Sequence, residues 1–133
     1  MLKMNLKRYW MENIAFNLNS NALINLNNKA IKISPEFKRE IIEVDENNAI
    51  VKITMRVSQT EEIPFNVYIT VCGAFECEKW KESEDGQGFI KITTVQVLFP
   101  YLRQAVSTIT GMANIPPYVL PIVNVRTLFE KDN

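Results

Sequence analysis

The stretch VLFPYLRQAVSTITGMANIPPYVLPIVNVRTLF, residues 97–129, predicts a helix, a proline-rich loop and the start of a second helix. On a helical wheel the mostly apolar side of the first helix covers roughly 200°, whereas a lone surface helix needs about half of that. That side consists of Val95, Val97, Leu98, Phe99, Tyr101, Leu102, Ala105, Val106, Thr108, Ile109 and Met112. We therefore expect the helix of residues 95–112 to pack on its own sheet with one face and on another subunit with the next. A central buried helix is the alternative.

The segment after this helix is apolar but cannot be helical. Gly111 suits a left-handed C-terminal cap, and the prolines of IPPYVLPIV, residues 115–123, exclude a helix. The segment is then an extended loop that forms either the wall of a groove or part of the core, and both remain open. Exposed apolar surface usually binds other chains. The candidate peptide contacts are Ile115, Tyr118 and Leu120 in the loop, Val125, Leu128 and Phe129 on the last helix, and Ile42 and Val44 at the groove base.

Upstream, apolar and polar residues alternate in four stretches, which is the period of a half-buried strand. These stretches cover residues 12–28, 37–44, 51–58 and 63–75. Short polar turns join the last three, which predicts an antiparallel meander, and the charged residues 79–88 predict an exposed loop. Strands first and helices last predict an α+β fold, a four-stranded antiparallel sheet with two C-terminal helices on one face, in one domain of residues 1–133.

Composition argues against several classes of function. Fifteen basic and fifteen acidic residues cancel, and Lys7-Arg8 is the one basic cluster, so we expect neither nucleic-acid binding nor a polybasic membrane anchor. Histidine, the commonest general base and transition-metal ligand, is absent, which argues against an enzyme. The acidic runs and the segment of residues 86–88 lack the spacing of calcium or phosphate sites, so we expect no metal and no cofactor.

The cysteines and the N-terminal residues indicate the compartment. Cys72 and Cys77 are five residues apart, a spacing that sends them to opposite faces of one strand, so we expect reduced thiols. The N-terminal residues lack the apolar region of a signal peptide, and no run approaches 18 apolar residues. We expect a cytoplasmic protein without membrane insertion.

Several ordered pieces of the chain resemble the SecB family of export chaperones. The pieces are Leu98-Phe99-Pro100-Tyr101, Arg103, Pro116-Pro117, Leu120-Pro121, Val123-Asn124 and Leu128-Phe129, which match the family pattern in order and spacing. Upstream, Ile14-Ala15-Phe16 resembles the Ile-Ser-Phe of the family's first strand, and Cys72-Gly73-Ala74-Phe75 resembles its Gly-Gly-Ile-Phe. The resemblance implies the same fold and a homotetramer built as a dimer of dimers.

We therefore predict an ATP-independent holdase that binds unfolded client polypeptides in protein export and keeps them from aggregating. A dedicated chaperone of an antitoxin or other single client is the alternative within the family. An oligomer with a structural or small-ligand role is the alternative from another class. The subunit contact is expected at Leu98, Tyr101, Leu102, Ala105, Val106 and Ile109.

The resemblance also bears on a partner. In typical members an acidic sheet face receives the cationic, zinc-bearing tail of the SecA motor. The corresponding positions here are Asn13, Asn17, Asn66 and Tyr68, so the charges are lost and the whole chain is neutral. Nearby carboxylates that compensate in part are Glu12, Glu76 and Glu78. We expect little or no SecA binding.

Overall fold

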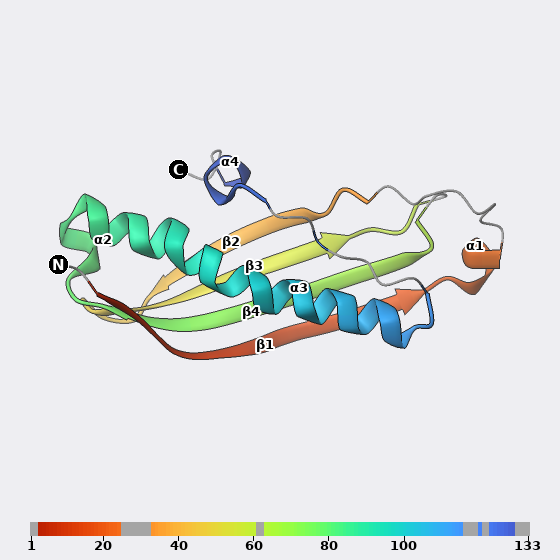
Figure 1. Cartoon of the computed structure of the whole chain (residues 1–133), viewed down its shortest axis with the longest axis horizontal. Helices are drawn as coiled ribbons and strands as arrows, with labels where there is room; N and C mark the ends of the chain where they lie inside the picture. The colour runs from red at the N-terminus through yellow and green to blue at the C-terminus, as the bar shows by residue number, and fades with distance from the viewer. Residues whose placement is uncertain (1–2, 25–32, 61–62, 116–119, 121–122, 130–133) are drawn as a thin grey trace.

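The computed structural model describes residues 3–24, 33–60, 63–115, 120 and 123–129, and it shows an elongated sheet crossed by one long helix (Figure 1). The strands are β1 (Met4–Leu18), β2 (Glu36–Glu43), β3 (Asn48–Val57) and β4 (Phe65–Cys77). All pair antiparallel, in the order β1-β4-β3-β2. The predicted four-stranded antiparallel sheet is confirmed, with β2, β3 and β4 as the meander. β1 lies at the edge beside β4, far from β2.

β1 begins well before the first strand expected from the sequence. Residues 4–11 were not predicted as strand, yet they pair with the end of β4. The register shifts between Leu6 and Arg8 and again between Met11 and Asn13. Each shift is a bulge that interrupts the two-residue alternation, so the pattern in the sequence is obscured.

β1 also ends earlier than expected. After Leu18, the side-chain oxygen of Asn19 accepts a hydrogen bond from the Ala22 amide at 2.9 Å and opens helix α1 (Ser20–Ile24). A side-chain cap of this kind favours a helical turn over continued strand. The prediction of strand as far as residue 28 was therefore wrong for α1, and its last residues lie outside the described part of the chain.

Residues 79–88, expected to be an exposed loop, are largely helical. The elements are η1 (Trp80–Glu82), α2 (Glu84–Gly88) and the π-helical turn η2 (Phe89–Thr93), followed by α3 (Thr94–Met112). The hydroxyl of Ser83 accepts a hydrogen bond from the Gly86 amide at 3.0 Å and caps α2, while Trp80 is 5% exposed. The Ser83 cap and the burial of the Trp80 indole stabilise the helical conformation, which the glycines and charges of this segment had argued against.

The predicted long helix is confirmed as α3, and the predicted second helix as the single turn α4 (Val125–Leu128). Gly111 is still helical, and the left-handed residue is Asn114, with φ of 60°. The expected Gly111 cap is therefore wrong. Asparagine can take this role because its short polar side chain tolerates the left-handed region. In the described segments, no helix has both the length and the apolar character needed to cross a membrane.

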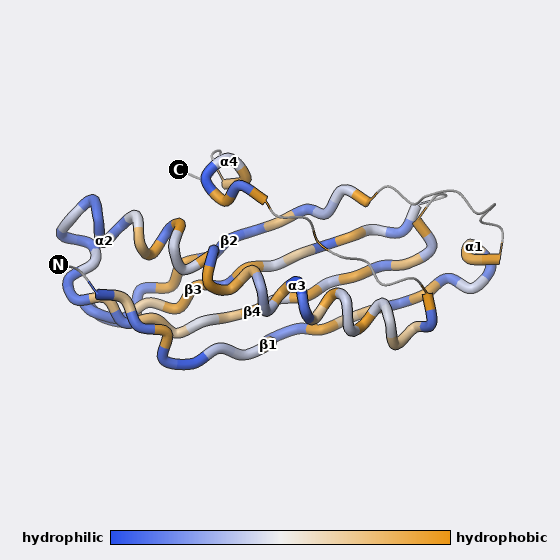
Figure 2. The backbone as a smooth tube through the Cα atoms, in the orientation of Figure 1, coloured by the Kyte–Doolittle hydropathy of each residue, from blue (hydrophilic) through white to orange (hydrophobic). Residues whose placement is uncertain are grey.

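The core lies between α3 and one face of the sheet. Hydrophobic and hydrophilic positions alternate along β3 and β4 (Figure 2), and the side chains facing α3 are only 0–3% exposed. They are Ala49, Val51, Ile53, Met55, Val57, Phe65, Val67, Ile69, Val71, Phe75 and Cys77. The polar residue Thr110 of α3 is also buried, and its hydroxyl donates a hydrogen bond to the Val106 carbonyl at 2.9 Å. Cys72 lies on the other face, and both cysteines are buried free thiols, as predicted.

Gly73 in β4 leaves no room for a side chain. A Cβ atom there would lie 2.6 Å from Cε2 of Phe75 and 2.9 Å from Cδ2 of Leu98. We expect Gly73→Ala to lower the free energy of unfolding by about 1–3 kcal/mol through overpacking, measured by urea denaturation. Gly88→Ala is the matched control, because no atom lies within 4 Å of its Cβ position and its backbone is helical, with φ of −64°. The control should be neutral or stabilising by up to about 1 kcal/mol. Equal effects of the two substitutions would contradict this packing.

Candidate functional site

The described residues among the expected peptide contacts lie on different faces of the sheet. Ile42 pairs with Ile50, whereas its neighbour Ile41 pairs with the buried Val51, so Ile42 faces away from α3 and α4. Val44 follows β2 in the turn to β3 and is 57% exposed. The expectation that these two form the base of a groove beside α4 is wrong. The sequence pattern showed a shared face but could not show which face the helices cover.

Three further candidates are packed inside the chain. Leu120, Val125 and Phe129 are 1%, 4% and 2% exposed. The Nε of Arg103 on α3 donates a hydrogen bond to the Leu120 carbonyl at 3.1 Å. The guanidinium carbon of Arg39 on β2 lies 4.9 Å from the centre of the Phe129 ring. Of the two interpretations of this segment, core packing applies to these three residues.

The segment still has apolar side chains at the surface. Ile115 and Leu128 are half-buried and pack against the edge of the core. Tyr118, the remaining candidate, lies outside the described residues. Asn124 positions α4, because its side-chain oxygen accepts a hydrogen bond from the Arg126 amide at 3.0 Å. Among the described candidates of this segment, only Ile115 and Leu128 therefore keep apolar surface.

The positions expected at a subunit contact divide into two faces of α3. Leu98, Leu102 and Val106 are fully buried against the sheet. Tyr101, Ala105 and Ile109 are half-buried and line a hollow shared with β1. Only the second set can therefore meet another molecule.

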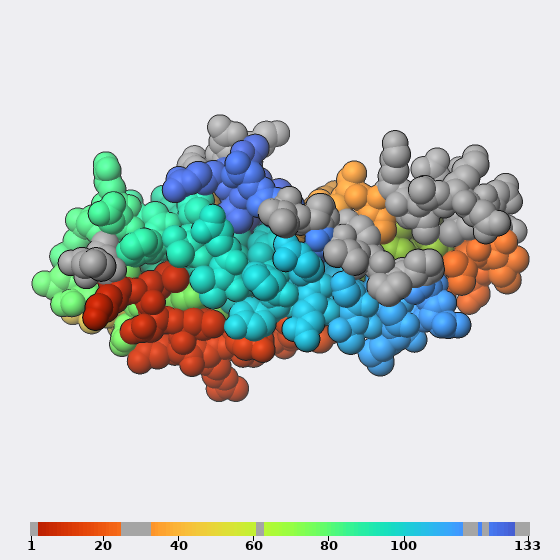
Figure 3. All heavy atoms as spheres, in the orientation of Figure 1, coloured from red at the N-terminus to blue at the C-terminus, as the bar shows by residue number. Residues whose placement is uncertain are grey.

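This hollow between α3 and β1, here called the edge hollow, is mostly apolar and measures about 420 Å³. β1 contributes Tyr9 and Ile14, which are 44% and 55% exposed, and α3 ends there with Met112, 81% exposed. The rings of Tyr9 and Tyr101 stack with centroids 3.9 Å apart. Figure 3 shows the side chains of β1 and α3 meeting at the surface of the molecule.

Sequence reasoning missed the part of β1 in the edge hollow. Tyr9 and Met11 are two residues apart, as are Ile14 and Phe16, but the step from Met11 to Ile14 is three. The bulge at Met11/Asn13 places both pairs on the same face despite this offset. The sequence signal that could have revealed this part of β1 was an apolar alternation interrupted by one extra residue between Met11 and Ile14.

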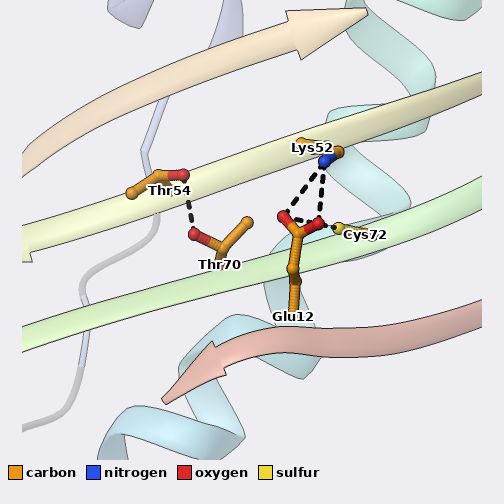
Figure 4. A network of polar contacts seen from close by, with 5 residues as sticks. All are labelled: Glu12, Lys52, Thr54, Thr70 and Cys72. Carbon is orange, nitrogen blue, oxygen red and sulfur yellow. Dashed lines mark hydrogen bonds and ion pairs between the residues drawn. The ribbon is translucent and has the colours of Figure 1, made fainter. Parts of the chain in front are cut away.

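The opposite face of the sheet, here called the far face, carries a polar network (Figure 4). The Lys52 ammonium contacts both carboxylate oxygens of Glu12, at 2.8 and 3.1 Å, and the Cys72 sulfur lies 3.9 Å from one of them. The hydroxyls of Thr54 and Thr70 are hydrogen-bonded at 2.9 Å. The hydrogen bond to Glu12 raises the pKa of Lys52.

The Cys72 thiol in this network is poorly suited to nucleophilic chemistry. Burial, followed by the nearby Glu12 carboxylate, raises the pKa of Cys72 to about 11. It is therefore protonated at neutral pH, and the thiolate is the reactive form. Among the described residues, no three histidine, cysteine or acidic side chains gather to hold a metal ion.

The four positions that the family resemblance relates to SecA contacts share the far face. Asn13 and Asn17 of β1 pair with Thr70 and Asn66 of β4, and Tyr68 pairs with Ala15. The structure therefore brings these side chains together on one surface, opposite α3. Arg56 of β3 joins them, with its guanidinium carbon 5.4 Å from the centre of the Tyr68 ring.

Comparisons with known proteins identify relatives of this chain. The family model for SecB, the preprotein translocase subunit, matches residues 1–133. Protein-export protein SecB of Anaplasma phagocytophilum is 27% identical over 84% of this chain and 71% of its own length. The protein MJ0357 of Methanocaldococcus jannaschii, described as uncharacterized, is 34% identical over 71% of this chain. That match covers 61% of the archaeal protein, so the chain spans about three fifths of that relative.

A solved structure has the same fold. It is the Mycobacterium tuberculosis Rv1957 SecB-like chaperone, in complex with a ChAD peptide from the Rv1956 HigA1 antitoxin. The TM-score is 0.66 at 15% identity, and the match covers 90% of both chains. This similarity concerns the fold, whereas the family model and the curated relatives concern the sequence itself. The family model, which matches the whole of residues 1–133, establishes that this chain belongs to the SecB family of protein-export chaperones.

Proposed function

We propose that this protein is an ATP-independent holdase that binds unfolded polypeptides. The observation that carries the proposal is the match of the SecB family model to residues 1–133. SecB is not a family of enzymes, and the site geometry supports a binding role, because apolar surface remains exposed on the helix-covered side of the sheet. Each buried apolar Å² contributes about 25 cal/mol, so an extended client gains affinity by adding many weak contacts.

Two apolar surfaces support separate roles. The edge hollow joins a broad face of α3 to an edge strand, and an unpaired edge readily adds a second chain. We assign it to the subunit contact of a homotetramer built as a dimer of dimers. The surface near Ile115 and Leu128 is then the one left for clients, and we retain Tyr118 as a client contact predicted from the sequence. A cytoplasmic location stays a prediction.

A dedicated client is the second candidate function. It is favoured by the fold shared with the Mycobacterium tuberculosis SecB-like chaperone, whose solved complex contains an antitoxin peptide. The uncharged residues at the SecA-contacting positions favour it too. Purifying the protein from its host and identifying the bound chains distinguishes the alternatives, since a dedicated chaperone retains one partner and a general one retains many.

The oligomer prediction depends on the edge hollow. Light scattering of the wild type should give the mass of a tetramer, and Ile14→Glu should dissociate it by placing a charge in an apolar contact. Ile24→Glu is the matched control, since Ile24 on α1 is 78% exposed and is not in the hollow. It should leave the mass unchanged. A wild-type mass of 15.4 kDa at micromolar concentration would refute the proposed assembly.

The holdase prediction is tested by aggregation of an unfolded apolar protein. Wild-type protein at sub-stoichiometric amounts should suppress the light scattered by the aggregate. The variant Ile115→Ser/Tyr118→Ser/Leu128→Ser should protect several-fold less, because each lost apolar side chain removes about 1–3 kcal/mol of contact with the client. Ile42→Ser is the control: it is 38% exposed but lies on the far face. Full protection by the triple variant would mean that clients bind elsewhere.

The SecA prediction concerns the far face. We expect no calorimetric signal for the zinc-bearing tail of the host SecA at physiological salt, because a neutral chain steers a cationic partner weakly. Asn13→Asp/Asn17→Glu should raise the affinity by restoring carboxylates on β1. An acidic member of the family provides the positive control. Low-micromolar, salt-sensitive binding by the wild type would show that the export partnership survives without these charges.

A further inference from the structure

The far face has a second feature, a hollow of about 200 Å³ beside Tyr68. Polar side chains from three strands and one turn line it: Asn17 of β1, Arg56 of β3, Asn66 and Tyr68 of β4, and Ser58 just after β3. Every hydrogen-bonding side chain in this set can donate, and no carboxylate lines the hollow. The chemistry of the lining therefore suits an acceptor with negative charge.

Two contacts orient the donors. The ring of Tyr68 faces the Arg56 guanidinium, 5.4 Å from ring centre to guanidinium carbon, which restricts this long side chain. The side-chain oxygen of Asn66 accepts a hydrogen bond from the Gln59 amide at 2.7 Å, so its NH₂ group is left to donate. Glu36 is the strand partner of Arg56, yet no ion pair links Arg56 to Glu36 or to another described carboxylate.

We propose that this hollow binds a carboxylate side chain from an acidic segment of a partner protein. A planar guanidinium matches a carboxylate through two parallel hydrogen bonds, and Asn17, Asn66 and Ser58 can complete the shell. Tyr68 also lines a neighbouring hollow in which Lys38 and Lys52 are balanced by Glu12 and Glu40, so the proposed site is confined to the hollow beside Arg56.

A nucleic acid fits this surface less well. The exposed Glu36 and Glu40 alternate with Lys38 on β2, so a continuous phosphate backbone would meet negative as well as positive charge. A segment with spaced acidic residues avoids this repulsion. The far face is opposite α3, so the inference does not depend on the holdase function, and either one can fail without the other.

The test is fluorescence anisotropy of a labelled 12-residue peptide in which Glu alternates with Ser, at low and physiological salt. Arg56→Gln should weaken binding by about tenfold, since a charge-assisted pair is lost. The affinity of Arg56→Lys should lie between those of Arg56→Gln and the wild type, because lysine keeps the positive charge but lacks the two parallel N–H donors of the guanidinium group. Arg8→Gln is the matched control: it removes one cation from the same face, away from the hollow, where Arg8 lies over Trp10. It should change the affinity less than about twofold.

Circular dichroism and the oligomer mass verify that each variant is folded. Three results would overturn the inference: equal weakening by Arg56→Gln and Arg8→Gln, equal binding of a peptide in which Gln replaces Glu, or no binding of the wild type at low salt. A single-stranded oligonucleotide that binds more tightly than the acidic peptide would also overturn it, and would indicate recognition of phosphates. The aggregation assay should be unaffected by Arg56→Gln, which separates this result from the holdase function.

Discussion

The packing of α3 across β3 and β4 is the constraint on which the other surfaces depend. Leu98, Leu102 and Val106 are fully buried, and the bare backbone at Gly73 accepts the Leu98 side chain. Because this face of α3 packs on the sheet, the adjacent face, which carries Tyr101, lies over β1. The edge hollow is thus a geometric consequence of the core, and its apolar side chains are left for contacts outside the chain.

Hydrogen bonds and ring contacts hold the ends of this packing in place. Arg39 of β2 donates to the Lys91 carbonyl at 2.7 Å, just before α3 begins, and also lies over the Phe129 ring. Arg103 of α3 donates a hydrogen bond to the carbonyl of Leu120, which lies between α3 and α4 in the chain. The two arginines connect the sheet, α3 and the C-terminal segment by hydrogen bonds to buried or half-buried backbone, which are strengthened by their charge.

The predictable parts of the fold are those with long, regular periods. β3, β4 and α3 were found from the sequence because their apolar residues repeat without interruption and each element buries one face in the core. β1 was misjudged because each bulge inserts a residue, and α2 because the cap at Ser83 and the burial of Trp80 are tertiary effects. Periodicity also cannot distinguish a core side chain from a groove wall, since both are apolar. Leu120 and Phe129 were therefore identified as important without their role being fixed.

The family resemblance named Asn13, Asn17, Asn66 and Tyr68, and the strand alternation between bulges correctly placed them on one face. Alternation could not predict which cations pair with the carboxylates that remain near this face. Glu12, at the bulge, reaches Lys52, and Glu76 lies 3.4 Å from Lys7, so two of the nearby acids are offset by neighbouring cations. Such exposed pairs add little stability, but they cancel local field. Among the described residues, Arg56, Lys38, Glu36 and Glu40 lie near these positions outside any ion pair, and of these charges only Arg56 lines the hollow of Asn17, Asn66 and Tyr68. The far face thus carries mixed charges, and the proposed acidic partner depends on the donors around Arg56 and not on the net charge of the face.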